Sequence, residues 1–256
     1  MLKKENPKRK NNRSLNSLRE ISFVRNYTKY AEGSVLVAFG DTKVLCNVSL
    51  DNTLPTWLKG TGKGWLTAEY SMLPRATDKR TRREVSLGKA SGRTLEIQRL
   101  IGRSLRSIVD LNVLGERTIT VDCDVIQADG GTRTAAITGG FLALNDAYQK
   151  MKSSSNNQIF LTDKIAAVSL GIINDQIFLD LDYSEDSTCD ADINVVMTSC
   201  GGIVEIQGTA EKKSFSEELL LNAVKNARNA LNKIFSLQNK MIDNPQIKKI
   251  TSETST

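Results

Sequence analysis

Histidine is absent from this chain of 256 residues. Its absence excludes the serine and cysteine triads that rely on an imidazole, zinc sites built on histidine, and histidine acid–base catalysis. Any chemistry must therefore use carboxylates, lysine, arginine, tyrosine or a metal ion. Aromatic residues make up only 5% of the chain, which argues against a nucleic-acid surface built from many stacked rings.

Cysteines and long apolar runs are also scarce. The four cysteines, Cys46, Cys123, Cys189 and Cys200, lack the CxxC spacing of zinc sites, and the first two lie in apolar runs. We therefore expect buried thiols in a reducing compartment, the cytoplasm. No apolar run approaches the roughly 18 residues of a membrane span. The basic residues near the N-terminus precede no apolar segment, so we expect neither a secretory signal nor a membrane partner.

The apolar pattern predicts an α+β protein in two similar halves. We expect strand hairpins over residues 34–50, 165–181 and 193–206, and amphipathic helices over 95–109 and 217–235, the latter with a capping box of Ser214 and Glu217. The corresponding organisation is a basic extension (1–17), a first unit (18–151), a polar linker (152–157), a second unit (158–237) and a disordered polar tail (238–256).

The most informative segment is QADGGTRT at residues 127–134, between a strand-like and a helix-like run. Gly130 and Gly131 let the backbone turn tightly and approach a ligand. Thr132 can cap the following helix, whose N-terminus attracts anions, and Arg133 can fork onto phosphate oxygens. Arg93 stands at the turn into another helix, where a second anion contact is natural. We therefore predict an oxyanion cradle, although a plain glycine turn stays open.

An acidic run occupies residues 180–192, with six carboxylates in thirteen residues between two strand-like segments. Such charges repel one another unless a cation or solvent separates them. A solvated acidic loop is one interpretation. The other is a site for Mg²⁺ or Mn²⁺, because these metals prefer oxygen ligands and are held by one or two carboxylates plus substrate phosphates.

Basic residues concentrate elsewhere and give the chain a net charge of +6. Residues 75–106 contain ten of them, mostly arginine, which pairs bidentately with phosphate. Arg80, Arg82 and Arg83 lie in a polar segment ahead of the helix that we expect at residue 95. We predict that they form a mobile basic arm that contacts RNA phosphates.

Several longer motifs resemble the ribonuclease PH family of bacteria in the family's order, over about residues 18–236. They are RNYT (25–28), AEGS (31–34), FGDT (39–42), TAEYSMLPR (67–75), GRTLEIQRLI (92–101), QADGGTRT (127–134) and DINVVM (192–197). The resemblance implies two βαβ-type units, each like domain 2 of ribosomal protein S5, packed into one protomer of a homohexamer built as a trimer of dimers. It also implies a phosphate-dependent 3′-to-5′ exoribonuclease that trims precursor tRNA and other RNA 3′ ends, releases nucleoside 5′-diphosphates and also runs in reverse as a nucleotidyltransferase.

The resemblance carries roles onto individual residues. It places inorganic phosphate, the co-substrate, on Arg93, Gly131, Thr132 and Arg133, and it makes Asp186 and Asp192 catalytic and ligands of Mg²⁺ or Mn²⁺, with Asp190 as a possible third ligand. Either aspartate could instead relay a proton. RNA contacts are implied for Arg75, Arg80 and Arg83. A metal-dependent hydrolytic ribonuclease and a non-catalytic RNA-binding ring subunit are the alternatives.

Overall fold

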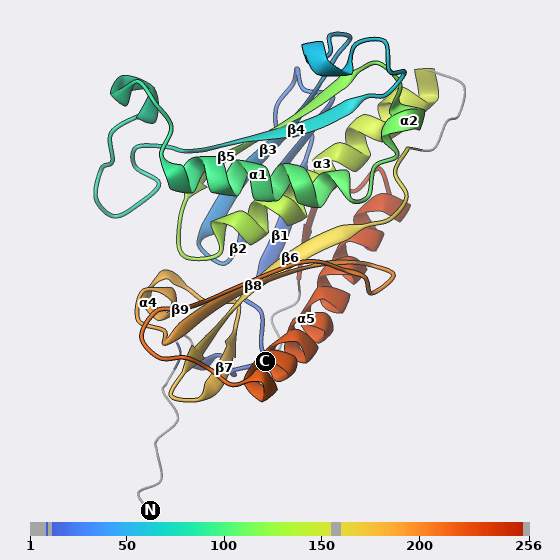
Figure 1. The fold of residues 1–256 in the computed structure, drawn as a ribbon. Coiled ribbons are helices and arrows are strands. Elements are labelled where there is room, and N and C mark those ends of the chain that lie inside the picture. The colour runs from blue at the N-terminus through green and yellow to red at the C-terminus, as the bar shows by residue number, and fades with distance from the viewer. Residues whose placement is uncertain (1–8, 10–11, 155–159, 253–256) are drawn as a thin grey trace, which may run out of the picture.

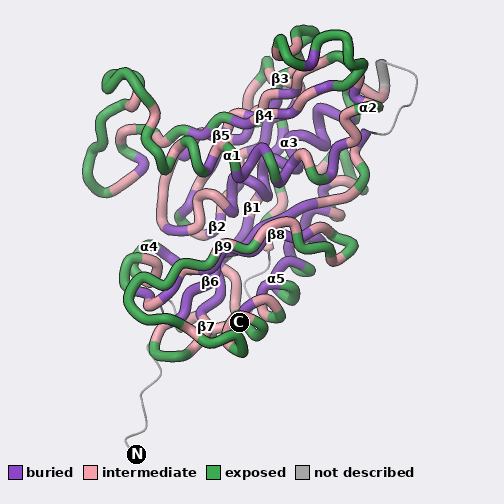
Figure 2. Tube along the Cα trace, in the orientation of Figure 1, coloured by how far each residue is buried: buried purple, intermediate pink, exposed green. Residues whose placement is uncertain are grey.

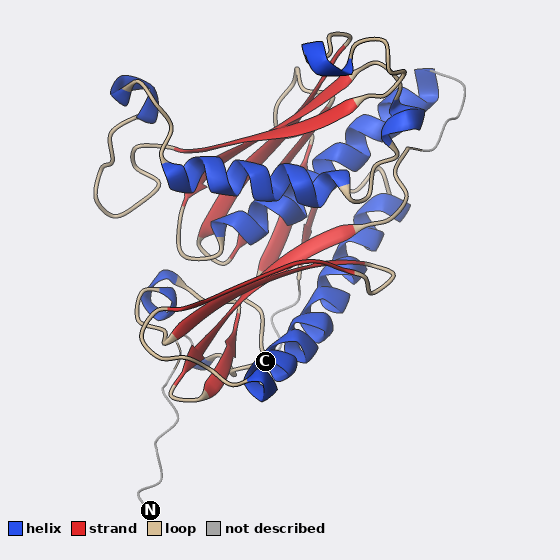
Figure 3. Ribbon diagram, viewed as in Figure 1, coloured by secondary structure: helices blue, strands red, loops and turns tan. Residues whose placement is uncertain are grey.

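Two β-sheets form the frame of the protein, a computed structural model that describes residues 9, 12–154 and 160–252. The first sheet has the order β10-β1-β2-β3-β5-β4 and the second β7-β6-β8-β9 (Figures 1 and 3). The strands of the first are β1 (Ile21–Arg25), β2 (Gly33–Phe39), β3 (Thr42–Asp51), β4 (Trp65–Met72), β5 (Thr118–Gln127) and β10 (Lys249–Thr251). Those of the second are β6 (Ile165–Ile173), β7 (Gln176–Leu179), β8 (Ala191–Thr198) and β9 (Ile203–Ala210).

Three long helices cover these sheets. They are α1 (Gly92–Arg106), α3 (Thr132–Ser154) and α5 (Glu217–Asp243), and the short helices are α2 (Leu111–Leu114), α4 (Tyr183–Asp186), η2 (Thr56–Leu58) and η3 (Glu84–Leu87). Helix α1 packs on β4, α5 packs on the second sheet, and α3 contacts β2 and β3 on one side and β6 on the other. Within the described residues no helix is long and apolar enough to cross a bilayer.

Alternating burial along the strands explains the layered core. Strands β1, β3 and β5 bury every second residue over most of their length, so one face of the first sheet packs against helices (Figure 2). Strand β6 is buried along nearly all of its length, because α3 and α5 both pack against it. The predicted α+β class and the three hairpins are confirmed.

The segment that follows the second unit returns to the first sheet, which differs from the predicted boundaries. Helix α5 continues to Asp243 because Gln238 is buried and its Nε2 donates to the carbonyls of Thr138 (3.3 Å) and Ile165 (3.2 Å). Strand β10 then pairs with β1 of the first sheet. A disordered tail from residue 238 is therefore wrong for residues 238–252.

Two smaller predictions also need correction. Residues 152–154 of the expected linker belong to α3, and residues 155–157 lie outside the described residues. The cap of α5 is Ser216 rather than Ser214: the Ser216 hydroxyl accepts from the Leu219 N–H at 3.2 Å.

Two neighbouring glycines of α3 provide a matched test of this packing. A Cβ on Gly139 would lie 2.4 Å from Cγ1 of Val37, whereas one on Gly140 would make ordinary contacts of 3.5 Å. We expect Gly139→Ala to destabilise the protein by about 1–3 kcal/mol through overpacking. Gly140→Ala should be neutral or stabilise it by up to about 1 kcal/mol, since alanine favours helix. Thermal unfolding of both variants measures this; equal effects would contradict the close packing of α3 on β2.

Candidate active site

The predicted oxyanion cradle is a tight turn between β5 and α3. Gly130 and Gly131 have φ angles of +78° and +65°, a region that favours glycine. The N–H groups of the first turn of α3, which begins at Thr132, have no acceptor within the helix and can bind an anion. The Thr132 hydroxyl lies 2.8 Å from the Tyr70 hydroxyl, so it contacts β4.

The two arginines come from the first turns of two helices. Arg93 is exposed in α1, which Ser91 caps by accepting from the Thr94 N–H at 3.1 Å. Arg133 is half-buried in α3, and its Nη1 donates to Gln207 of β9 (2.9 Å) and to Glu96 of α1 (3.1 Å). The side chain of Arg133 thus contacts both the first unit and the second sheet.

Two aspartates lie close to these arginines. Asp186 ends α4 and Asp192 lies in β8. Burial and then the Asp186 carboxylate raise the pKa of Asp192 to about 6, against the opposing effect of Arg133 and Arg93. Burial also raises the pKa of Asp186, while Arg93 and Arg133 lower it. The structure therefore brings together the four charged residues that the sequence selected.

Other carboxylates of the acidic run have structural roles. Asp182 caps α4, a short helix that the sequence pattern did not indicate, by accepting from the Glu185 N–H at 3.0 Å. Oδ2 of Asp190 accepts from the Asn174 N–H at 2.9 Å and ties down the β6–β7 turn. The role of Asp190 as a third metal ligand stays a prediction. The run is neither a loose loop nor a cluster of six carboxylates around one cation.

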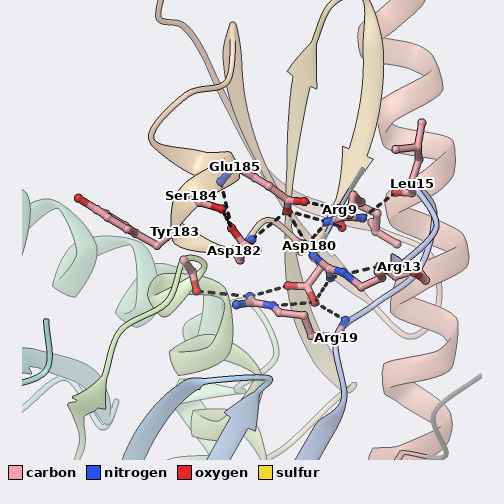
Figure 4. Close-up of polar contacts among 12 residues, drawn as sticks. Arg9, Arg13, Leu15, Arg19, Asp180, Asp182, Tyr183, Ser184 and Glu185 are labelled. Carbon is pink, nitrogen blue, oxygen red and sulfur yellow. Dashed lines mark hydrogen bonds and ion pairs between the residues drawn. The ribbon is translucent and has the colours of Figure 1, made fainter. Parts of the chain in front are cut away.

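A buried ion pair connects the cradle to the acidic run (Figure 4). Asp180 accepts from the backbone N–H of Arg19 (2.7 Å), from its Nε (3.1 Å) and from its Nη2 (2.7 Å). The same guanidinium donates to the carbonyls of Asp129 (2.5 Å) and Gly130 (3.3 Å) in the cradle. Burial favours the neutral acid, but Arg19 and its hydrogen bonds hold the pKa of Asp180 below its ordinary value. Asp180 is therefore ionised.

Two further arginines of the N-terminal extension secure α4. Arg9 forks onto Glu185, with Nε 2.7 Å from Oε1 and Nη2 2.8 Å from Oε2. Arg13 lies 3.2 Å from Glu185 and 3.5 Å from Asp180 (Figure 4). Sequence patterns missed these roles because each arginine pairs with a carboxylate far along the chain.

The carboxylates of Asp186 and Asp192 fit a divalent cation whose other ligands are substrate oxygens. Asp186 and Asp192 form no salt bridge within the described residues, and burial raises the pKa of each. No cluster of three or more acidic or cysteine ligands occurs in that part of the chain. Two carboxylates suit Mg²⁺ or Mn²⁺ that also binds phosphate oxygens.

The basic arm leads into the helix that carries Arg93, and the Thr94 hydroxyl donates to Glu84 at the end of the arm at 2.7 Å. Arg75, Arg80, Arg82 and Arg83 are all exposed in the segment between β4 and α1, which projects from the body of the protein (Figure 1). None of the four forms a salt bridge with another described residue. Their charges are free to meet a polyanion.

The raised pKa of Asp192 predicts a pH-dependent effect on stability. In the unfolded chain the group ionises near 3.8, but in the folded protein near 6, so ionisation progressively opposes folding between these values and fully above them. We expect Asp192→Asn in EDTA to raise Tm at pH 8 by several degrees, since each kcal/mol shifts Tm by about 2–4 °C. The gain should shrink toward pH 4. A constant or absent gain across this range would contradict the burial of an ionisable Asp192.

The chain is similar to known proteins over both of its units. Residues 17–148 match the first domain of the 3′ exoribonuclease family, and residues 163–230 match its second domain. Rice (Oryza sativa) Rrp46 shares 22% identity and a TM-score of 0.74, over 90% of this chain and 98% of that one.

Two archaeal structures share the same fold. The Archaeoglobus fulgidus exosome with RNA bound to the active site has a chain of 20% identity and TM-score 0.78, covering 90% of this chain and 92% of that one. An archaeal exosome core has 19% identity and TM-score 0.69, over 89% and 88%. The family matches span both units, and this chain therefore belongs to the 3′ exoribonuclease family of the RNase PH type.

Proposed function

We propose that this protein is a phosphate-dependent 3′-to-5′ exoribonuclease of the bacterial ribonuclease PH kind, which trims the 3′ end of precursor tRNA and releases nucleoside 5′-diphosphates. The observation that carries the proposal is the placement of an anion cradle with two arginines beside a pair of half-buried carboxylates. A hydrolytic nuclease needs the carboxylates but has no use for a cradle that binds free phosphate.

The reaction follows from positioning rather than from a strong general base. Arg93, Arg133 and the N–H groups at the start of α3 hold inorganic phosphate in line with the last phosphodiester bond. An oxygen of this phosphate attacks the phosphorus, a P–O–P bond forms, and the bond to the 3′ oxygen breaks. The shortened RNA leaves with a protonated 3′ hydroxyl, and the reverse reaction adds a nucleotide.

Asp186 and Asp192 would hold a magnesium or manganese ion, which supplies charge neutralisation at the phosphorus and the departing oxygen. Asp192 has a second capacity, because a carboxyl with a pKa of about 6 exchanges a proton near neutral pH. Its proton can then reach the 3′ oxygen. Metal binding and proton relay are distinguished by whether Mn²⁺ restores turnover to Asp192→Asn.

The exposed arm gives the protein a means to hold a folded RNA away from the site. Arg75, Arg80 and Arg83 carry the proposed contacts, which are phosphate contacts without sequence preference. We further propose that the protein assembles as a homohexamer, in which several arms would surround one RNA. Precursor tRNA is the substrate that such an arrangement favours over a short oligonucleotide.

The test is incubation of a 3′-extended tRNA with Mg²⁺, with and without inorganic phosphate. We expect nucleoside diphosphates only when phosphate is present, and a loss of about a hundredfold or more in Asp186→Asn. Nucleoside monophosphates without phosphate would identify a hydrolase, and no product under either condition would identify a non-catalytic RNA-binding subunit.

The same assay separates the arm from the site. The double variant Arg80→Ala/Arg83→Ala should lose activity on tRNA as salt rises, yet cleave a short single-stranded oligonucleotide at nearly the normal rate. Sedimentation of the variant controls for assembly. Equal losses on both substrates would place these arginines in the reaction channel instead.

A further inference from the structure

Tyr183 is an exposed aromatic residue at the edge of the candidate active site. It is the first residue of α4, three positions before Asp186, and its side chain is 64% exposed. Its hydroxyl and ring form no hydrogen bond or ring contact with any other described residue. Tyr27 and Tyr30 are exposed as well, but Tyr183 is the exposed tyrosine that lies in α4 with Asp186.

The backbone of Tyr183 is fixed against the cradle. Its N–H donates to Oδ1 of Asp129 at 3.2 Å, and Asp129 directly precedes the two cradle glycines. A Cβ on Gly130 would lie 3.1 Å from the same nitrogen, so the cradle and the start of α4 are in close contact. The backbone that carries the exposed ring is therefore held at a contact between the two units.

The direction of the ring follows from its helix. Residues three apart lie on one side of a helix, so Tyr183 lies on the side of α4 that carries Asp186. In Figure 4 the Tyr183 side chain points away from the network of Arg19 and Asp180, on the side where the green ribbon of the first unit is drawn. The ring thus starts from a backbone position beside the cradle, on the side of α4 that carries Asp186.

We propose that Tyr183 is the stacking surface for the base of the 3′-terminal nucleotide, the one that leaves as product. This inference rests on the proposed function. That function places the last phosphodiester bond between the cradle and the acidic pair, so the base of the 3′-terminal nucleotide lies within one nucleotide of both. Stacking on a ring tolerates every base, because each has a π-face. That property suits an enzyme that must remove any nucleotide from an RNA end.

The proposed stacking depends on the ring and not on the hydroxyl, so two variants separate the contributions of these groups. We would measure phosphorolysis of two oligonucleotides, one normal and one with an abasic 3′-terminal nucleotide, by wild type, Tyr183→Phe and Tyr183→Ala. We expect wild type and Tyr183→Phe to prefer the normal end by roughly tenfold in kcat/KM. Tyr183→Ala should lose most of this preference, with an unchanged KM for phosphate.

Two results would overturn the stacking role. The first is a normal preference for the intact end in Tyr183→Ala. The second is an equal loss on both substrates, which would mark a structural residue or, if sedimentation also changes, a contact between subunits. Failure of the proposed function is separate, since wild type would then release no nucleoside diphosphate from either oligonucleotide.

Discussion

The buried pair of Arg19 and Asp180 connects the cradle of the first unit to the acidic run of the second. Its guanidinium binds a carboxylate of the second unit and two carbonyls of the cradle in the first. Asp180 has a φ of +55°, an unusual conformation for a residue with a side chain, and the three donors from Arg19 stabilise it there. Removing one partner of such a buried pair costs about 3–5 kcal/mol, because the other charge is left uncompensated.

Around this pair, the residues proposed to bind phosphate and the two aspartates come from different elements. The cradle and Arg133 come from the start of α3, whereas Asp186 and Asp192 come from α4 and β8. Gly130 is required where these parts meet, since a Cβ there would lie 2.5 Å from the carbonyl oxygen of Leu181. In the proposed reaction, a separation of about 1 Å between the parts would remove phosphate from the line of attack. The proposed reaction therefore requires rigidity at this junction.

Local features of the site could be predicted from the sequence, and distant pairings could not. The strand, glycine turn and helix around Gly131 are contiguous in the chain, so periodicity and glycine placement indicate them. The partners of Asp180 and Glu185 lie more than 160 positions away, at Arg19 and Arg9. No spacing rule connects such residues. The end of α5 was missed because Gln238 is polar and its burial depends on carbonyls of α3 and β6.

The most direct test of this junction is the turnover of Arg19→Lys, which keeps the charge but loses the fork. Arg25→Lys is the matched control, because Arg25 forms a comparable buried pair with Asp146 and donates to the Met241 carbonyl, away from the cradle. Both variants should lose stability. Below their unfolding temperatures, we expect phosphorolysis by Arg19→Lys to fall at least about tenfold in kcat, while Arg25→Lys stays near wild type. Normal turnover in folded Arg19→Lys, or equal losses in both, would contradict a specific role for this pair in aligning the site.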